Sequence, residues 1–389
     1  MADLSFTVKT EVSVPQAHLA SLPGLSDAQG GVTLWRHGLR GWEQVPCQAE
    51  ATGSAPRLCW ISDGNPDREV QYRLSASAPS RDPQEAGSGF AVQDCQYRFK
   101  VRWNGAIVGA YNFIGQREVG LEAGALPTIV DPRVNLAWVG FKPFWYPLYT
   151  PAGLRLTENS PADHPHHHSV WFGHAKVNGV DCWIETGSGG KILLQEIRDV
   201  VAGPVFAGWT ETNWWVGPDG TKLFEEDRSH RLWHVGQGYL LDMALTFRAT
   251  EGAVHFEKEK DAGLGIRVAD SLDVEDGGLI LNSHGDRNEA GTFNRPADWL
   301  DYSGPVSGRT GGLAVFNGPD VPIHPWFTRD YGPLLSNFMR FQPYLLPPGE
   351  QLRLSFRLYL HDGDANAARV AEHYTAFKMP PRVVMEARR

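Results

Sequence analysis

Regular alternation of apolar and polar residues is the feature that most constrains how this chain can fold. In residues 97–103, YRFKVRW, the aromatic and aliphatic side chains fall on one face of an extended chain and the basic side chains on the other. Residues 239–248 and 352–360 repeat the same period of two. Because successive side chains of a strand point to opposite faces of a sheet, this period predicts antiparallel strands with one buried face.

Turn signals separate these runs. Strand-like segments recur about every 10–15 residues between about 95 and 360, and several are divided by Gly-Gly, Pro-Asp-Gly or Asn-Gly. We therefore predict an all-β fold built around a large antiparallel β-supersandwich. One C-terminal helix is expected over 364–377, DANAARVAEHYTAF, where apolar residues recur at helical spacing before Pro380-Pro381.

A polar segment rich in proline, glycine and serine, PSRDPQEAGSG at 79–89, is typical of a linker. A length of 389 residues also suggests two domains. We predict a small N-terminal β-sandwich domain at 1–84, with strand-like VKTEVSV, TLW and VQYRLSA, followed by the large β-supersandwich domain at 90–389.

The chain is acidic, with 36 Lys and Arg against 45 Asp and Glu and a net charge of −9. It lacks the overall positive charge that non-specific binding to nucleic acids or anionic membranes requires. No run approaches the roughly 18 apolar residues of a membrane span, and no leader pattern opens the sequence. We expect a soluble cytoplasmic protein that binds neither nucleic acid nor membrane.

Cysteine and glycine motifs give little sign of metal or nucleotide chemistry. The four cysteines, Cys47, Cys59, Cys95 and Cys182, form no CxxC pair, so we expect thiols buried in a reducing compartment. Neither GxGxxG between strand and helix nor GxSxG is present. The segment TGSGGKI at 186–192 lacks phosphate-loop spacing and is interpreted as a hairpin turn.

The segment 159–183, NSPADHPHHHSVWFGHAKVNGVDCW, carries five of the 14 histidines. On an extended backbone His164, His166 and His168 share one face and His167 takes the other. Such imidazoles can transfer protons or bind substrate, can hold a divalent metal ion, or can simply bond to backbone at a polar rim. A metal site formed by His164, His166 and His168 needs a further ligand. The candidates for it are His284, His324, Glu196 and Glu211.

Tryptophans and charged loop residues form a second signal. Indole faces suit sugar rings, although each tryptophan can equally belong to the core. The tryptophans concerned are Trp171, Trp183, Trp209, Trp214, Trp215, Trp233, Trp299 and Trp326. The loops NSHGDRNE at 282–289 and PIHPWFTRDYG at 322–332 add charged and aromatic residues beside glycine and proline. Lys258 and Lys260 are expected on the same face as Val254 and Phe256, which is unusual for lysine away from a site.

Several ordered motifs resemble those of the bacterial PmoA-like family, a domain of unknown function. They are TPAGLRLTENSPADHPHHHSVWFG, DAGLGIRVAD, RPADWLDYSG, HPWFTRDYG and the closing helix, between about 95 and 377. The resemblance implies a galactose-mutarotase-like fold, shared by sugar epimerases, glycoside hydrolases and polysaccharide lyases, often after a small β-sandwich. The methane-oxygenase label of the family does not fit a chain without a membrane span.

The family motif DHPHH falls on Asp163, His164, Pro165, His166 and His167. The family continues with Arg-Gly, whereas this chain has His168-Ser169, which removes an anion-binding position and favours metal binding. The segment 115–140 is longer than in the family and is expected to form a loop that covers the cleft.

Together these observations lead to the hypothesis of a carbohydrate-active enzyme that uses acid–base chemistry on a small-molecule sugar or glycoside, of the epimerase, lyase or hydrolase type. The alternatives are a divalent-metal-dependent sugar enzyme and a non-catalytic carbohydrate-binding module. The candidate catalytic residues are His164, His166, Glu196 and Lys260. The candidate substrate-binding residues are His167, Trp171, Arg267, His284, Trp299, His324, Trp326, Arg329 and Asp330. The sequence requires no cofactor. The cofactor that the histidines make possible is a divalent metal ion.

Overall fold

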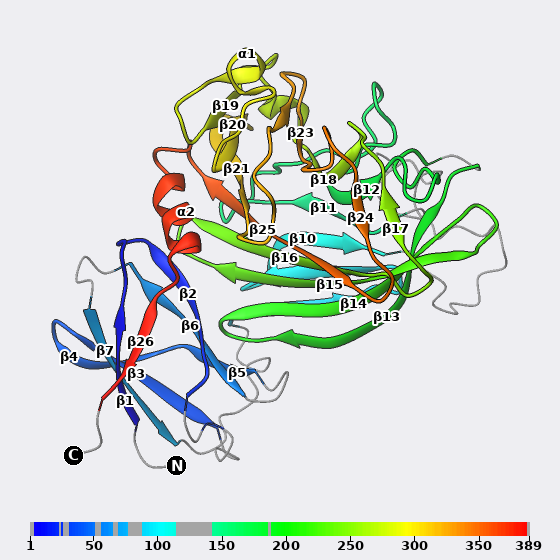
Figure 1. Cartoon of the computed structure of the whole chain (residues 1–389). Coiled ribbons are helices and arrows are strands. Elements are labelled where there is room, and N and C mark those ends of the chain that lie inside the picture. The colour runs from blue at the N-terminus through cyan, green and yellow to red at the C-terminus, as the bar shows by residue number, and fades with distance from the viewer. Residues whose placement is uncertain are drawn as a thin grey trace.

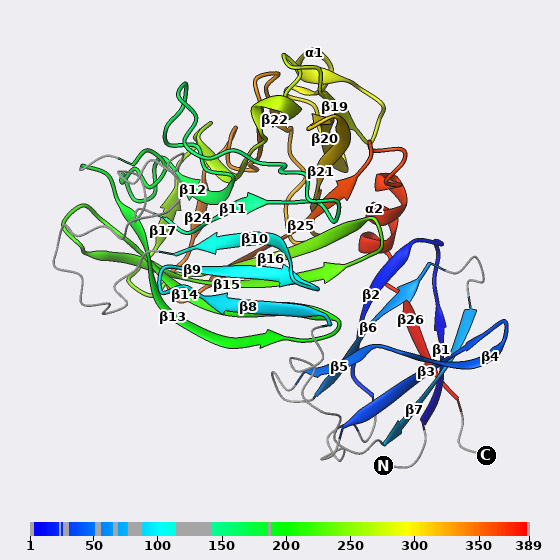
Figure 2. The ribbon, with the colours of Figure 1, turned by 180° about the vertical axis from the view of Figure 1, so that it is seen from behind.

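A computed structural model of the chain describes residues 4–22, 25, 31–50, 56–64, 69–76, 88–113, 142–185 and 188–386. A small β-sandwich lies beside a much larger one, and the larger unit carries the described helices (Figures 1 and 2). The predicted all-β class, with two packed antiparallel sheets after a small sandwich, is confirmed. Residues 79–87 of the predicted linker, residues 186–187 of the predicted hairpin turn and the whole predicted covering loop at 115–140 lie outside the described residues.

The small unit packs a five-stranded sheet on a three-stranded sheet. The first has the order β26 (Arg382–Met385), β1 (Leu4–Lys9), β7 (Glu69–Ala76), β3 (Val32–Gly38) and β4 (Gly41–Val45). The second has the order β2 (Pro15–Ala20), β6 (Arg57–Asp63) and β5 (Cys47–Glu50). The buried ring of Phe6 joins the two sheets, since it stacks on Tyr72 at 5.5 Å and meets Trp60 edge-on at 5.8 Å.

Strand β26 departs from the predicted division of the chain. It pairs antiparallel with β1, with Phe6 opposite Met385 and Lys9 opposite Arg382. The expected boundary assigned residues 382–385 to the large domain, whereas here the chain crosses back to the first sheet after the C-terminal helix. A single domain boundary in the linker cannot describe a chain that returns to its first domain. Pairing between strands this far apart in the sequence leaves no pattern in the residues around either strand.

The large unit consists of two eight-stranded antiparallel sheets packed face to face. The first has the order β22 (Phe327–Thr328), β23 (Pro333–Ser336), β18 (Ala262–Arg267), β12 (Val170–His174), β11 (Phe144–Leu148), β10 (Ala106–Asn112), β9 (Arg98–Trp103) and β8 (Phe90–Asp94). The second has the order β13 (Lys191–Ala202), β14 (Phe206–Val216), β15 (Lys222–His234), β16 (Gly238–Arg248), β25 (Gln351–Asp362), β21 (Arg309–Asn317), β20 (Trp299–Val306) and β19 (Leu279–Asn282). Phe99 of the first sheet meets Trp209 of the second at 5.1 Å within the shared core.

The predicted periodicity agrees with the burial of these strands. Strands β16 and β25 alternate buried and partly exposed residues along most of their length. The predicted Asn-Gly hairpin joins β9 to β10, and both turn residues have positive φ, 46° at Asn104 and 83° at Gly105. This combination matches the right-handed twist of a two-residue hairpin, and glycine adopts it at little energetic expense.

Short elements complete the large unit. Strands β17 (Val254–Phe256) and β24 (Tyr344–Leu346) form a two-stranded sheet, and a 3₁₀ turn spans Asp270–Leu272. The C-terminal helix α2 spans Val370–Lys378, later in its start than predicted, and α1 (Asn288–Thr292) was not predicted. Tyr374 and Phe377 of α2 pack on Phe316 at 5.6 and 6.0 Å. Within the described ranges, no helix is long and apolar enough to cross a membrane.

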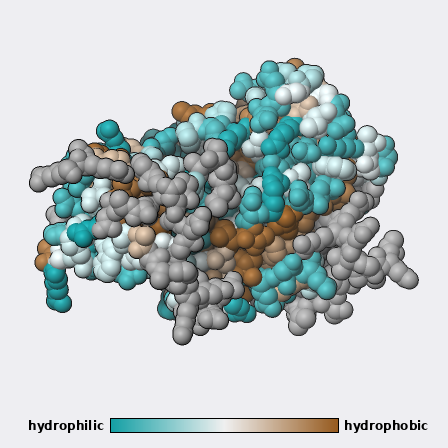
Figure 3. Space-filling model, turned by 90° about the horizontal axis from the view of Figure 1, so that it is seen from below, coloured by the Kyte–Doolittle hydropathy of each residue, from teal (hydrophilic) through white to brown (hydrophobic). Residues whose placement is uncertain are grey.

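The small unit docks on the second large sheet near the start of β14. The side-chain oxygen of Gln48 accepts hydrogen bonds from the backbone N–H groups of Val205 and Phe206, at 3.3 and 3.2 Å. Buried Cys59 joins the apolar cluster around Trp233 there. Seen from below, hydrophobic residues form a band across the large unit between hydrophilic patches (Figure 3).

All four cysteines are free thiols. Cys59 and Cys182 are buried as expected, whereas Cys47 and Cys95 are partly exposed.

Candidate functional site

Strand register brings three segments together at one end of the first large sheet. Val170 at the start of β12 pairs with Ile266 near the end of β18. Arg267, the last residue of β18, pairs with Pro333 at the start of β23. The turn that precedes β12, the end of β18 and the β22–β23 connection therefore converge, although they lie far apart in the sequence.

The outer face of these strands forms an aromatic floor. Phe144, Trp171, Trp183 and Leu335 make a buried apolar cluster there, separate from the core between the two sheets. Gly265 leaves room for it, because a Cβ at this position would stand 2.6 Å from the Trp171 ring. The absence of a side chain at Gly265 thus allows the indole of Trp171 to lie directly on the backbone of β18.

The histidine segment 163–168 is a turn rather than a strand. The N–H of His164 donates to the carbonyl of Pro161, and the N–H of His167 donates to the carbonyl of His164. The backbone folds back within three residues, so the alternation expected for an extended chain does not hold. His164 stacks on His167 instead of sharing a face with His168.

Four aromatic rings form a column above the floor. Tyr331 stacks on His164 at 5.4 Å, His164 on His167 at 4.5 Å, and His167 on Trp171 at 5.5 Å, with interplanar angles of 13°, 13° and 29°. The column covers both faces of the His164 imidazole and leaves its edges accessible, with 37% of the side chain exposed. His166 lies beside the column, 4.7 Å from His167.

Asp163 fixes the orientation of His164. One oxygen of its carboxylate lies 2.8 Å from Nδ1 of His164, and Arg267 donates two hydrogen bonds to the carboxylate at 3.0 and 3.2 Å. Burial acts to raise the pKa of Asp163, but the hydrogen bonds from His164 and Arg267 hold it below its usual value. The carboxylate is therefore ionised at neutral pH, and in the part of the chain that the structure describes it is Nδ1 of His164, not Nε2, that has a hydrogen-bond partner.

The other histidines of the turn are kept neutral. Burial, aided by the charges of Lys142 and His164, lowers the pKa of His166 to about 4. Burial lowers the pKa of His167 to about 2. A neutral imidazole at pH 7 can accept a proton or donate a hydrogen bond, so His166 fits a supporting polar role beside His164.

The predicted metal ligand set is not assembled. Both ring nitrogens of fully buried His168 are occupied, Nε2 by Glu185 and Nδ1 by Asn159, each at 2.7 Å. Glu185 is also paired with buried Lys142 at 2.9 Å. Among the described residues no group of three or more His, Cys, Asp or Glu side chains is arranged to hold a metal ion. His168 instead anchors the turn from below.

Two residues that the sequence did not single out interact with His164. Asp261, just before β18, is close enough to His164 for their charges to interact, and burial raises the pKa of its carboxyl group. Tyr331 follows the predicted Arg329-Asp330 pair and caps the ring column. A carboxyl group that retains its proton more readily than usual suits a general acid opposite an imidazole.

Both predicted opposing catalytic groups lie elsewhere or at the margin. Glu196 is exposed on β13 of the second sheet and faces Arg198 at 3.9 Å, so it does not oppose the histidines. Lys260 is 68% exposed and lies 3.8 Å from Asp261 at the rim. Strand β17 ends at Phe256, and Lys258 and Lys260 are therefore exposed beyond it rather than on its apolar face.

The predicted substrate-binding residues divide into three groups. His167, Trp171 and Arg267 belong to the histidine site, and Arg329 and Asp330 lie beside Tyr331. Arg329 is paired with Glu289, and Asp330 accepts a hydrogen bond from the Glu289 N–H at 2.8 Å. His284 and His324 line a different pocket, of about 200 Å³, next to α2. Trp299 and Trp326 are buried in apolar clusters, so they offer no face to a sugar.

Most of the tryptophans belong to the protein core and are not placed to contact a sugar. All those named from the sequence are buried except Trp214, which is 38% exposed. Trp171 carries His167 on its face rather than a ligand.

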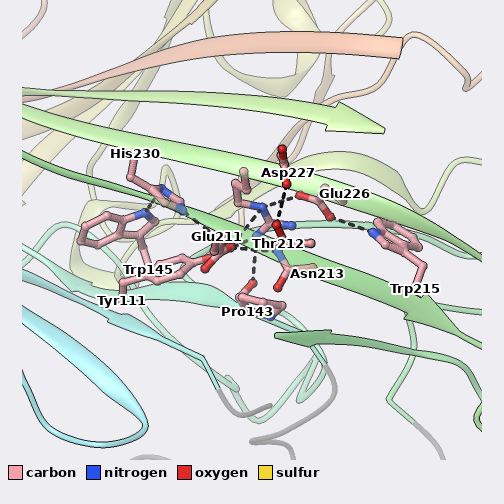
Figure 4. A network of polar contacts seen from close by, with 11 residues as sticks. Tyr111, Pro143, Trp145, Glu211, Thr212, Asn213, Trp215, Glu226, Asp227 and His230 are labelled. Carbon is pink, nitrogen blue, oxygen red and sulfur yellow. Dashed lines mark hydrogen bonds and ion pairs between the residues drawn. The ribbon is translucent and has the colours of Figure 1, made fainter. Parts of the chain in front are cut away.

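Glu211, considered as a further metal ligand, belongs to a buried polar network between the two large sheets (Figure 4). Its carboxylate accepts hydrogen bonds from Tyr111 and from Asn213, at 2.5 and 3.0 Å. Arg228 lies 2.6 Å from Glu226 and 3.7 Å from Glu211. Tyr111, Glu211, Asn213, Glu226 and Arg228 are all buried, so these residues stabilise the sandwich rather than face solvent.

A polar cavity of about 490 Å³ lies between the small unit and the outer face of the second large sheet. Most of its charged side chains are already paired. Glu50 bridges Arg57 and Arg231, and Asp242 receives two hydrogen bonds from Arg357. The cavity contains none of the residues predicted to act on substrate.

A family model described as "Family of unknown function (DUF6807)" matches residues 130–375, which is more than half of the chain. The chain belongs to this family. The expected domain of unknown function is thereby confirmed, and the matched DUF6807 region contains the whole histidine turn, Asp261, Arg267 and Tyr331. The PmoA name stays a prediction.

Comparison with curated proteins gave no match to this sequence. Among solved structures, an alpha-mannosidase from Enterococcus faecalis V583 is similar, with a TM-score of 0.44 and 8% sequence identity. The likeness covers 100% of this chain and 46% of that one, so the chain spans about half the length of the mannosidase.

Proposed function

We propose that this protein is an acid–base enzyme that acts on a carbohydrate, with His164 as the group that transfers the proton. The observation that carries the proposal is the Asp163–His164 pair: an ionised carboxylate holds Nδ1 of an imidazole whose opposite edge is accessible. This arrangement fixes the tautomer and stabilises the imidazolium that forms when Nε2 takes a proton.

Asp261 is the opposing group in this proposal. Asp261 takes the role opposite to that of His164, one group delivering a proton while the other accepts one, and burial shifts the pKa of Asp261 in the direction that a proton donor needs. The exchange of roles serves epimerisation, elimination and hydrolysis alike. Asp163 acts as a positioning residue. His166, neutral at pH 7, supplies a hydrogen bond to a hydroxyl group.

The carbohydrate assignment is supported by the character of the site. Half-exposed polar side chains surround the edge of an aromatic column, and directional hydrogen bonds beside flat rings are what sugar hydroxyls and ring faces require. The resemblance of several sequence motifs to the PmoA-like family also implies a carbohydrate substrate.

The test is turnover of a panel of neutral hexoses, uronates, oligosaccharides and 3-keto sugars in D₂O, followed by NMR and mass spectrometry. We expect product formation, or deuterium incorporation at a sugar carbon, that falls at least 100-fold in His164→Gln. His284→Gln is the matched control, since that exposed histidine lies at the pocket beside α2.

Equal turnover by His164→Gln and the unaltered protein would contradict the proposal. Tight binding without turnover, unchanged in His164→Gln, would instead identify a non-catalytic carbohydrate-binding module.

A further inference from the structure

Arg340 is an arginine without an ionic partner at the rim of the histidine site. It follows β23 and makes no ion pair or hydrogen bond with other described residues, and its Nη1 is buried without a partner. Its neighbour Arg329, by contrast, is neutralised by Glu289. A partly buried guanidinium whose nitrogen lacks a partner is unfavourable unless a ligand supplies the missing acceptor.

Aromatic rings hold this guanidinium in place. Its carbon lies 4.8 Å from the centroid of the Phe293 ring, 5.0 Å from Phe327 and 5.2 Å from Phe341. Arg329 stands over the same Phe293 and Phe327 rings at 4.3 and 4.8 Å. The two arginines are therefore kept close together, where an anion relieves the repulsion between their charges.

Arg340 also interacts electrostatically with a proposed catalytic group, Asp261. Asp261 is within electrostatic range of both His164 and Arg340. Arg329 and His164 both lie near Tyr331, the cap of the ring column. Burial and the charge of Arg329 lower the pKa of Arg340, while the charge of Asp261 acts in the opposite direction. These pairwise interactions connect Arg340 and Arg329 with the other members of the site, His164, Asp261 and Tyr331.

We infer that the substrate is an acidic sugar whose carboxylate is bound by Arg340. This inference rests on the proposed function and names the substrate class of the same site. A carboxylate carries one negative charge and matches a planar guanidinium through two parallel hydrogen bonds. Because Glu289 neutralises Arg329, the site offers one unpaired positive charge, which favours a carboxylate over a dianionic phosphate.

Calorimetric titration of the full chain tests the inference by binding alone. The probes are D-galacturonate and D-glucuronate, the matched neutral sugars D-galactose and D-glucose, and D-glucose 6-phosphate. We expect at least one uronate to bind 10-fold or more tightly than its neutral counterpart, with an affinity that falls as salt rises. Arg340→Gln removes this preference and leaves neutral-sugar affinity unchanged, whereas Arg340→Lys retains part of it.

The control is Arg309→Gln, which alters an exposed arginine at the start of β21 and keeps the preference. The inference is overturned if no uronate binds, if neutral sugars bind as tightly, if Arg340→Gln keeps the preference, or if the sugar phosphate binds more tightly than both uronates. Circular dichroism confirms that each variant is folded. Turnover of the same uronates by the unaltered protein separates the two proposals: uronate binding that depends on Arg340, with no turnover, supports this inference and contradicts the proposed function.

Discussion

Asp163 and His164 are consecutive residues whose side chains meet, with a carboxylate oxygen 2.8 Å from Nδ1. The same carboxylate neutralises Arg267, which is only 4% exposed. One acidic group thus serves two neighbours: it orients the exposed imidazole and compensates a buried guanidinium. The histidine turn is consequently fastened to the end of β18, and its stability is linked to the geometry of the site.

Replacing Asp163 tests this double role. Asp163→Ala leaves the Arg267 charge buried without a partner, and we expect the free energy of unfolding to fall by about 2–3 kcal/mol. In an Arg267→Met background the same replacement is expected to lower it by less than about 1 kcal/mol. Urea denaturation of the four proteins measures the coupling. Equal losses in both backgrounds would show that the ion pair contributes nothing.

Gly265 provides a test of the aromatic floor. A methyl group at this position would stand 2.6 Å from the Trp171 ring, so Gly265→Ala must displace the indole on which His167 rests. We expect a loss of about 1–3 kcal/mol from overpacking. Gly291→Ala in α1 is the control, since its nearest contact is 3.3 Å and alanine favours helix. Thermal melts compare the two, and a smaller loss at Gly265 than at Gly291 would contradict the packing described.

Buried histidines predict a loss of stability in mild acid. Burial lowers the pKa of His18 and of His373 to about 3, and that of His167 to about 2. The native state keeps them neutral, while the unfolded chain binds protons below about pH 6.5. Stability is therefore constant above that pH and falls toward pH 3 by about 1.4 kcal/mol per pH unit for each histidine.

Urea midpoints at pH 5.0, 6.0 and 7.5 measure this dependence. His18→Leu removes one titrating group and is expected to reduce the slope between pH 6.0 and 5.0 by the contribution of one histidine. A slope unchanged by this replacement would argue against a neutral buried His18.

The buried network around Glu211 depends on the guanidinium of Arg228. Arg228→Leu leaves Glu211 and Glu226 buried without a cation, and we expect a loss of about 3–5 kcal/mol. Arg198→Leu is the matched control on the outer face of the same sheet, where Arg248 still pairs with Asp227, and it is expected to lose less than about 1 kcal/mol. Similar losses in the two variants, measured by denaturation, would refute the structural role of the network.

Local patterns were sufficient to predict the architecture. The period of two in β16 and β25 reports which residues are buried, and the Asn104-Gly105 turn follows from backbone conformations that few other residue pairs adopt. Strand β26 was missed because its partner β1 lies at the other end of the chain.

The site was predictable only where its residues share a motif or a strand register. His164, His166 and His167 lie in one turn, and Arg267 reaches it because Val170 pairs with Ile266. Glu196 and His284 were misplaced, since their distance from the turn depends on the strand order of both sheets. Arg340 stands in NFMRFQ, a segment with no sequence signal, and only the packing of Phe293 and Phe327 places it at the rim.

The pairing of β26 with β1 has a consequence for biosynthesis. During translation, the small unit leaves the ribosome before the large one, yet its five-stranded sheet reaches full width only after the segment that follows α2 has been made. Until then β1 presents an unpaired edge, to which a strand from another nascent chain can add. Domain order along the gene is thus not the order in which the two sandwiches are finished.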